Sequence, residues 1–266
     1  MNKLYFGILF FIFLLLSLVC VEKSTAQQSR FPRFKVLAFY NENVEKAHVD
    51  FAKDAINYFK DLNIGKGFIF DITTDFSDLN DEKLSGYQLI IMLNDQPHTQ
   101  KERDAFQRYM ENGGGWMGFH VAAYNDKYTN WPWYLDFLGG GIFYRNNWPA
   151  MPAKLVIDES HPVTRGLPDS FIAPENEWYQ WKPSPRENKN IKVLVSLSPE
   201  NYPLGLKDIL LDGDLPVVWT NTNYRMIYLN MGHGNREFND ATQNHLIINA
   251  FRWVVSIDKN GDPFIK

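Results

Sequence analysis

The sequence predicts an α/β protein built on a mostly parallel β-sheet with helices on both faces. Apolar runs alternate with helical patterns between residues 34 and 122, which is typical of a doubly wound sheet. The run "YQLIIML" at 87–93 is apolar throughout, as expected for a parallel strand covered on both faces. The stretch "ENGGGWMGFHVAAYN" at 111–125 leads from glycines through a short apolar strand to a histidine. Such a strand presents a reactive group at its carboxyl end.

The alternating part of the chain is expected to contain four strands and two helices. Apolar runs predict the strands at 34–41, 67–74, 87–93 and 116–122. A helix is predicted at 47–62 because its apolar residues recur at helical spacing. They are Ala47, Phe51, Ala55, Phe59 and Leu62. The second helix is the charged, amphipathic segment 99–115, which ends in glycines.

The pattern changes in the second half of the chain. Residues 130–149 are rich in Trp, Tyr and Gly, and we expect irregular structure there, near the strand ends. Further strands are predicted at 153–158, 191–197, 216–221 and 225–232, of which the last two form a hairpin. A helix at 240–255 closes the fold. Because no repeat or linker interrupts residues 27–266, we expect a single domain.

Residues 1–26 have the pattern of a secretory signal peptide. A lysine precedes an apolar run from Leu4 to Val21, and Ser24, Thr25 and Ala26 provide a cleavage site. Cleavage removes the only cysteine, Cys20, so the mature chain has no disulfide. We expect a periplasmic or secreted protein with no stable membrane span after cleavage. An uncleaved anchor and lipid attachment to Cys20 are the alternatives.

Composition narrows the classes of partner. The net charge of −4 and the pI near 5.9 argue against nucleic acid, which requires a basic excess. Aromatic residues make up 15% of the chain, which suits a sugar-facing surface and a thick core equally well.

Polar side chains follow three of the predicted strands. Ligands of open α/β sheets bind at the carboxyl ends of the strands. Asn94 and Asp95 follow the third strand, His120 ends the fourth, and His233 follows the last. Glycines beside both histidines allow a ligand to approach the backbone. We therefore expect the two imidazoles to meet in one pocket.

Four blocks carry a resemblance to a known family. They are "GGGWMGFHVAAYN" at 113–125, "HPVTRGLP" at 161–168, "ENEWY" at 175–179 and "IYLNMGHG" at 227–234. Together they resemble, in order, the signature blocks of the ThuA-like, or trehalose-utilisation, family, over residues 34–256. The resemblance implies the fold of class I glutamine amidotransferases, a flavodoxin-like sheet with flanking helices and an added β element. It also implies a role in sugar utilisation.

The resemblance places His120 where amidotransferases carry their nucleophilic cysteine. Those enzymes have "G-x-C" in the turn where this chain has "G-F-H". Because no cysteine remains after signal cleavage, no thiolate is available to attack an amide carbon. The sequence therefore excludes glutaminase chemistry.

The candidate catalytic residues are His120, His233 and Glu177, which matches an acidic position of the family's third block. They suit acid–base chemistry on a sugar, and the same three residues are candidate ligands for a divalent metal such as Zn²⁺. Other residues are candidates for binding the substrate, three of them tryptophans whose faces suit a pyranose ring. They are Asn94, Asp95, Tyr179, Trp131, Trp133 and Trp148.

Three kinds of function remain open at this stage. The first is an exported carbohydrate-processing enzyme, a lyase, hydrolase or isomerase acting on a glucoside or keto-sugar. A conventional glycosidase fits less well, because it requires two carboxylates across the scissile bond. The second is a non-catalytic sugar-binding module that uses the same pocket. The third uses the aromatic segment 128–150 as a contact in a homo-oligomer.

The remaining histidines have simpler interpretations. His161 is expected to cap a short helix, and His48 and His245 to lie on polar helical faces. His98 sits near a helix start and is given no role.

Overall fold

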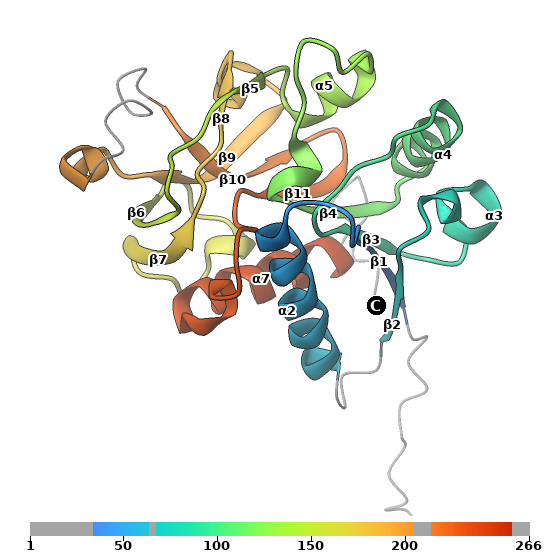
Figure 1. Cartoon of the computed structure of the whole chain (residues 1–266), viewed down its shortest axis with the longest axis horizontal. Coiled ribbons are helices and arrows are strands. Elements are labelled where there is room, and N and C mark those ends of the chain that lie inside the picture. Colours follow the sequence, from blue (N-terminus) through green and yellow to red (C-terminus); the bar gives the residue numbers. More distant parts are fainter. Residues whose placement is uncertain (1–33, 64–67, 205–213, 257–266) are drawn as a thin grey trace, which may run out of the picture. The chain divides into compact units, whose positions relative to one another are not determined.

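The computed structural model describes residues 34–63, 68–204 and 214–256, within one compact unit that begins at Phe34 (Figure 1). The predicted signal peptide and Cys20 lie outside the described residues, so export stays a prediction. Among the helices of the described residues, none is long and apolar enough to span a membrane.

One mixed sheet of nine strands runs through the described residues, in the order β2-β1-β3-β4-β11-β10-β9-β6-β7. Its first five strands are parallel: β2 (Ile69–Thr73), β1 (Lys35–Phe39), β3 (Leu89–Met92), β4 (Gly115–Phe119) and β11 (Arg225–Leu229). Four antiparallel strands continue it: β10 (Pro216–Asn221), β9 (Ile191–Leu197), β6 (Met151–Ile157) and β7 (Ser170–Asn176). The predicted α/β class and the β10–β11 hairpin are confirmed.

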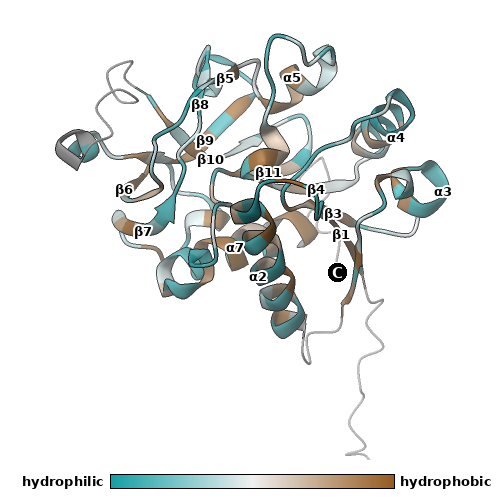
Figure 2. Cartoon of the chain, in the orientation of Figure 1, coloured by the Kyte–Doolittle hydropathy of each residue, from teal (hydrophilic) through white to brown (hydrophobic). Residues whose placement is uncertain are grey.

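Helices cover both faces of the sheet, as Figure 2 shows by the apolar strands between them. Helices α2 (Lys46–Asn63) and α7 (Ala241–Ser256) pack on one face. Helices α3 (Asp81–Leu84), α4 (Gln100–Glu111) and α5 (Pro132–Leu138) pack on the other. Side chains of β1 alternate between the two cores, because successive residues of a strand point to opposite faces.

The segment 130–149, predicted to be irregular, contains regular structure. It forms α5 and then β5 (Ile142–Arg145), which pairs antiparallel with β8 (Gln180–Lys182) in a separate ribbon. Pro132 starts α5, where its missing N–H costs nothing. The helix has only seven residues, too few for a convincing periodic pattern. Strands β7 and β8 were not predicted either, because both are short or interrupted by polar residues and proline.

The register of β4 and β11 sets the position of the site. The two strands are parallel, and Phe119 at the end of β4 pairs with Leu229 at the end of β11. His120 and Asn230 therefore leave the sheet side by side, at the edge where the carboxyl ends of the parallel strands gather (Figure 1).

Candidate functional site

His120 begins a 3₁₀ turn directly after β4 and is fully buried. Its φ of 42° is uncommon for a residue with a β carbon and is typical of strained functional positions. Nδ1 lies 3.0 Å from the carbonyl oxygen of Asn230. Because a carbonyl only accepts, Nδ1 carries the proton, and the lone pair of His120 is on Nε2. That Nε2 is buried without a hydrogen-bond partner among the described residues.

His233 lies in the loop after β11, and buried side chains hold this loop. Asn176 Oδ1 accepts from the backbone N–H groups of Gly232 and His233, at 3.2 and 3.1 Å. Glu237 Oε1 accepts from the same two groups, at 3.1 and 3.4 Å. The imidazole of His233 is thus positioned by a rigid loop, with 8% of the residue exposed.

Glu177 lies between the two predicted histidines. Its Oε2 is 4.0 Å from His120 Nε2, and its Oε1 is 3.8 Å from His233 Nε2. Both distances exceed that of a direct hydrogen bond and leave room for a shared ligand. Burial raises the pKa of Glu177 to about 7, and the nearby carboxylate of Glu45 adds to this shift. The expected convergence of His120, His233 and Glu177 is what the geometry shows.

His48 is a third histidine of the site, and its predicted place on a polar helical face is wrong. The residue is 7% exposed, and its ring lies 5.3 Å from that of His120 and 5.2 Å from that of His233. The helical spacing contained a signal, because His48 precedes the buried Phe51 and Ala52 by three and four residues. His48 therefore continues the apolar stripe of α2.

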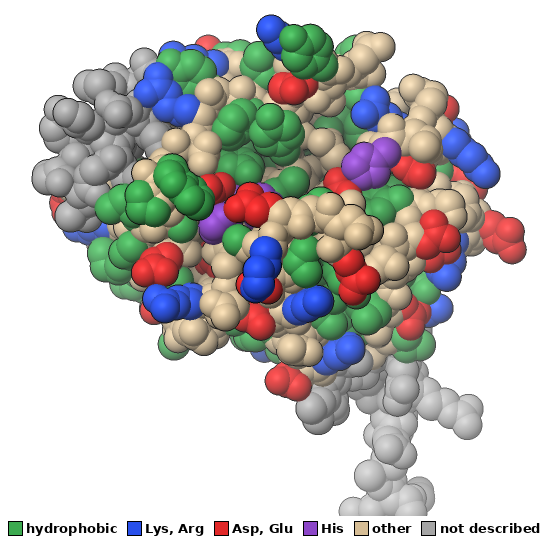
Figure 3. Space-filling view, viewed as in Figure 1, with side chains coloured by type: hydrophobic (Ala, Val, Ile, Leu, Met, Phe, Trp, Pro, Cys, Tyr) green, Lys and Arg blue, Asp and Glu red, His purple; other side chains and the backbone are tan. Residues whose placement is uncertain are grey.

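Glu45 provides a second carboxylate at the entrance. It directly precedes α2, and its side chain is 53% exposed. Its Oε1 lies 3.7 Å from His233 Nε2, and its Oε2 lies 3.8 Å from His48 Nδ1. The five residues Glu45, His48, His120, Glu177 and His233 are called the histidine cluster below. Figure 3 shows histidine atoms at the surface among acidic and hydrophobic side chains.

The imidazoles of the histidine cluster favour the neutral form. Burial lowers the pKa of His120 well below its usual value, and repulsion from His48 and His233 lowers it further. Burial, followed by His233, lowers the pKa of His48 to about 4. Burial also lowers the pKa of His233, although Glu45 opposes this. Neutral imidazoles can accept a proton or bind a metal ion.

Two sets of three side chains have ligand atoms within 4.8 Å of one another. One set is His48, His120 and Glu177, and the other is Glu45, His48 and His233. His48 belongs to both, so the predicted metal set of His120, His233 and Glu177 lacked the residue common to the two geometric sets.

Tyr179 and Trp148 lie beside the histidine cluster. The ring centroid of Tyr179 is 3.8 Å from that of His120, and its backbone exchanges two hydrogen bonds with the amide of Asn230, at 3.1 and 2.8 Å. Trp148 is 73% exposed, and its ring lies edge-on to His233 at 6.5 Å. An exposed indole at this position is available to a sugar ring.

Trp131 and Trp133 are placed in the core beside α4 instead. Trp131 is 4% exposed and stacks on Tyr134 at 4.4 Å. Trp133 stacks on Phe137 at 5.0 Å. Among the described contacts, none joins either indole to the histidine cluster, so their geometry is that of core filling.

Asn94 and Asp95 are occupied by protein partners. The fully buried Asn94 side chain accepts from the Asn41 N–H at 2.8 Å and donates to the carbonyl oxygen of His48 at 3.3 Å. Asp95 accepts from Asn41 Nδ2 at 2.6 Å and pairs with His98 Nε2 at 2.8 Å. These contacts brace the segment that leads to His48 and favour a supporting role over the expected substrate contact.

The other expected histidine roles are confirmed. His161 Nδ1 accepts from the Val163 N–H at 3.3 Å and caps a short 3₁₀ helix. His245 is exposed on α7.

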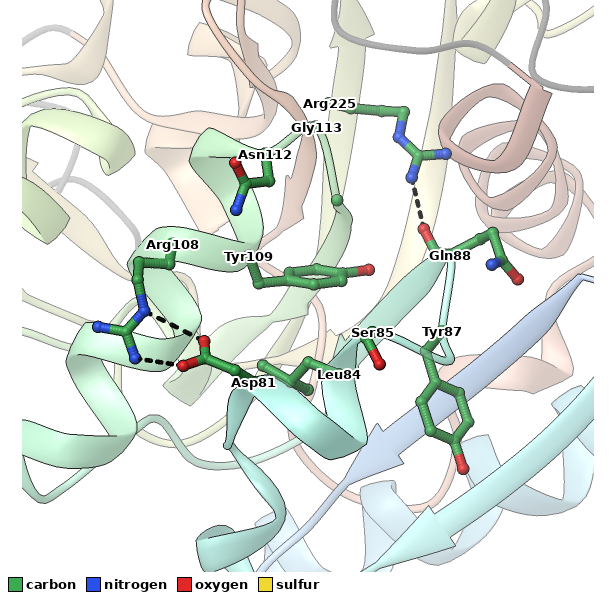
Figure 4. Close-up of a pocket in the computed structure, with 11 residues that line it drawn as sticks. Asp81, Leu84, Ser85, Tyr87, Gln88, Arg108, Tyr109, Asn112, Gly113 and Arg225 are labelled. Atoms are coloured by element: carbon green, nitrogen blue, oxygen red, sulfur yellow. Dashed lines mark hydrogen bonds and ion pairs between the residues drawn. The ribbon is translucent and has the colours of Figure 1, made fainter.

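A cavity of about 520 Å³ lies elsewhere, at the amino ends of β3 and β4 (Figure 4). Its charged groups are satisfied by the protein: Arg108 pairs with Asp81 at 2.9 Å, and Arg225 donates to the carbonyl oxygens of Gln88 and Val254. The cavity lies at the opposite edge of the sheet from the histidine cluster, so we do not regard it as the functional site.

The fold defines a class of protein. A parallel sheet flanked by helices, with an antiparallel extension and a functional turn after β4, is the fold of class I glutamine amidotransferase-like proteins. A GMP synthase protein from Thermoplasma acidophilum shares it, with a TM-score of 0.52 at 11% identity, over 84% of this chain and 95% of that one. This likeness concerns the fold alone.

The chain belongs to the ThuA family, described as trehalose utilisation, whose model matches residues 35–254. A ThuA-like protein from Bacteroides uniformis ATCC 8492 is 62% identical, with a TM-score of 0.85, over 91% of this chain and 99% of that one. A ThuA-like protein from Parabacteroides merdae ATCC 43184 is 20% identical, with a TM-score of 0.59, over 88% and 92% of the chains. A comparison with curated proteins yields no match.

Proposed function

We propose that this protein is an exported enzyme that processes a carbohydrate, a glucoside or keto-sugar, by proton transfer at a carbon beside a carbonyl group. One observation carries the proposal: three imidazole Nε2 atoms, buried without hydrogen-bond partners among the described residues, gather around the carboxyl group of Glu177. The family's description as trehalose utilisation supports a sugar substrate. Glutaminase activity is not part of the proposal, because His120 stands at the nucleophile's position.

His233 is the residue best placed to act as the base. It lies nearest the entrance, beside the exposed Trp148, whereas His120 is fully buried. When His233 Nε2 takes a proton from the sugar, the carboxylate of Glu45, 3.7 Å away, stabilises the imidazolium. The electron pair of the broken C–H bond forms an enolate, whose oxygen requires a stabilising group at the floor of the site.

The experiment is deuterium exchange by the purified protein on keto-disaccharides and unoxidised disaccharides, followed by NMR. We expect deuterium at the carbon beside the carbonyl, together with product formation. His233→Gln should lower the rate by about 10²- to 10⁴-fold, whereas the exposed histidine variant His245→Gln should match the wild type.

The alternative is a non-catalytic sugar-binding module, which the exposed ring of Trp148 favours. A protein that binds the sugars but catalyses neither exchange nor product formation would establish that alternative. In that case His233→Gln would change only the affinity.

Export has its own test. Residues 1–26 support it by their signal-peptide pattern. The mass of the protein recovered from the periplasm or medium of a bacterial host should correspond to a chain that begins at Gln27. Retention of the full chain in the membrane fraction would contradict cleavage.

A further inference from the structure

We propose that His48, His120 and Glu177 bind one divalent transition-metal ion at the floor of the site. The proposal deepens the proposed function, and its catalytic part rests on that function, because the ion would face the oxygen of the enolate. Metal binding itself does not depend on the reaction.

The three side chains have the chemistry and spacing of a metal site. Two imidazoles and one carboxylate on one side of an ion form a facial triad that leaves positions open for substrate. Their ligand atoms lie within 4.8 Å of one another, and His120 Nε2 is 4.0 Å from Glu177 Oε2. Nitrogen and oxygen ligands lie about 2.0–2.2 Å from Zn²⁺, so small side-chain rotations bring all three atoms onto one ion.

Unpartnered nitrogens are the second, independent observation. Nε2 of His48, of His120 and of His233 is buried and has no hydrogen-bond partner among the described residues. Buried polar atoms are nearly always paired, so a group of three at one place indicates a ligand. The lone pairs of these nitrogens face a shared space, because the rings lie 5.2–6.2 Å apart.

The surroundings of His120 prepare its Nε2 for a metal. Metal-binding histidines usually donate their second N–H to a carbonyl or carboxylate, which fixes the tautomer and the ring orientation. His120 Nδ1 donates to the Asn230 carbonyl oxygen at 3.0 Å. His48 Nδ1 likewise faces Glu45 Oε2 at 3.8 Å. In both residues the free nitrogen is therefore Nε2.

Burial selects this set over the second one. All three members of the set His48, His120 and Glu177 are buried, whereas the set with His233 includes the exposed Glu45. The buried set also leaves His233 free to act as the base. An ion with two neutral ligands and one carboxylate keeps a net positive charge, which polarises a carbonyl group and stabilises an enolate oxygen.

The test is a titration of the EDTA-treated full-length protein with Zn²⁺ and with Mn²⁺, by calorimetry and by metal analysis after dialysis. We expect one ion per chain. His48→Gln and Glu177→Gln should each weaken binding at least 100-fold. His233→Gln and the surface control His245→Gln should stay within a few-fold of the wild type. Circular dichroism of each variant verifies the fold.

Two results would overturn the inference: no stoichiometric binding of either ion by the wild type, or binding that survives both His48→Gln and Glu177→Gln in folded proteins. Deuterium exchange separates this inference from the proposed function. Stoichiometric binding without exchange on any sugar leaves the metal site standing and removes the proposed reaction. Full exchange by metal-free protein leaves the reaction standing and removes the catalytic part of this inference.

Discussion

Gly232 packs directly against His120: a β carbon at position 232 would lie 2.4 Å from the β carbon of His120. The φ of Gly232 is 156°, and its N–H donates to Asn176. This contact sets how closely the loop of His233 approaches the turn of His120. The glycine is therefore required by space at the site.

Gly232→Ala should separate the two turns. We expect a loss of about 1–3 kcal/mol in the free energy of unfolding, as for other overpacked sites, and a large loss of activity. Urea denaturation and the exchange assay measure the two effects. Gly234→Ala is the control, because Gly234 also has a positive φ but has open space around it. Equal costs for the two variants would show that the overlap with His120 is unimportant.

Asn230→Ala should loosen the connection between β11 and Tyr179. The Asn230 side chain satisfies both the N–H and the carbonyl group of Tyr179, and each buried group left unpaired costs about 1–3 kcal/mol. The urea midpoint should fall accordingly. The exposed Asn223 provides the comparison, since Asn223→Ala should change stability by less than about 0.5 kcal/mol. A midpoint unchanged in Asn230→Ala would contradict this account.

Trp148→Ala and Trp131→Ala should behave in opposite ways. Trp148 is exposed beside His233, so its loss should raise KM for the sugar and leave stability nearly unchanged. Trp131 is buried against Tyr134, so its loss should cost about 3–5 kcal/mol of stability. Steady-state kinetics and urea denaturation distinguish them. An unchanged KM in Trp148→Ala would remove this indole from the binding site.

His161 should make the fold sensitive to acid. Burial lowers the pKa of His161 to about 4 in the folded protein, against about 6.5 in the unfolded chain. Between these values only the unfolded chain binds the proton. Stability is therefore complete above pH 6.5 and falls as the pH drops toward 4.

His161→Asn tests this pH dependence, because asparagine still caps a helix but does not titrate. The buried histidines of the site have lowered pKa values too, so some acid sensitivity should remain in the variant. Its loss of stability between pH 7 and pH 5, measured by urea denaturation, should be smaller than that of the wild type. Equal losses would refute the assignment to His161.

Several features of the fold were predictable because they depend on local patterns. The strands predicted at 191–197 and 216–221 coincide with β9 and β10, and α2 differs from its prediction by one residue at each end. Apolar periodicity determines these elements, since each must bury one or both faces. His120 and His233 followed from the rule that ligands bind where parallel strands end.

The composition of the site was only partly predictable. Glu177 came from the family resemblance, because nothing in its local sequence distinguishes it from a surface carboxylate. Glu45 was not singled out, and His48 was assigned to the polar side of its helix. The tryptophans shared one aromatic segment, yet Trp148 is exposed beside the site while Trp131 is in the core.

The sequence by itself determined which segments form strands and helices, which faces they bury, and that a histidine replaces the thiol at the end of β4. Tertiary structure decided which side chains meet. Helix α2 brings Glu45 and His48 to the ends of β4 and β11, where the Gly234 N–H donates to the Ala47 carbonyl oxygen at 3.0 Å. The turn after β7 brings Glu177 from the antiparallel end of the sheet. Local periodicity specifies burial, whereas these distances depend on strand order and register across the whole sheet.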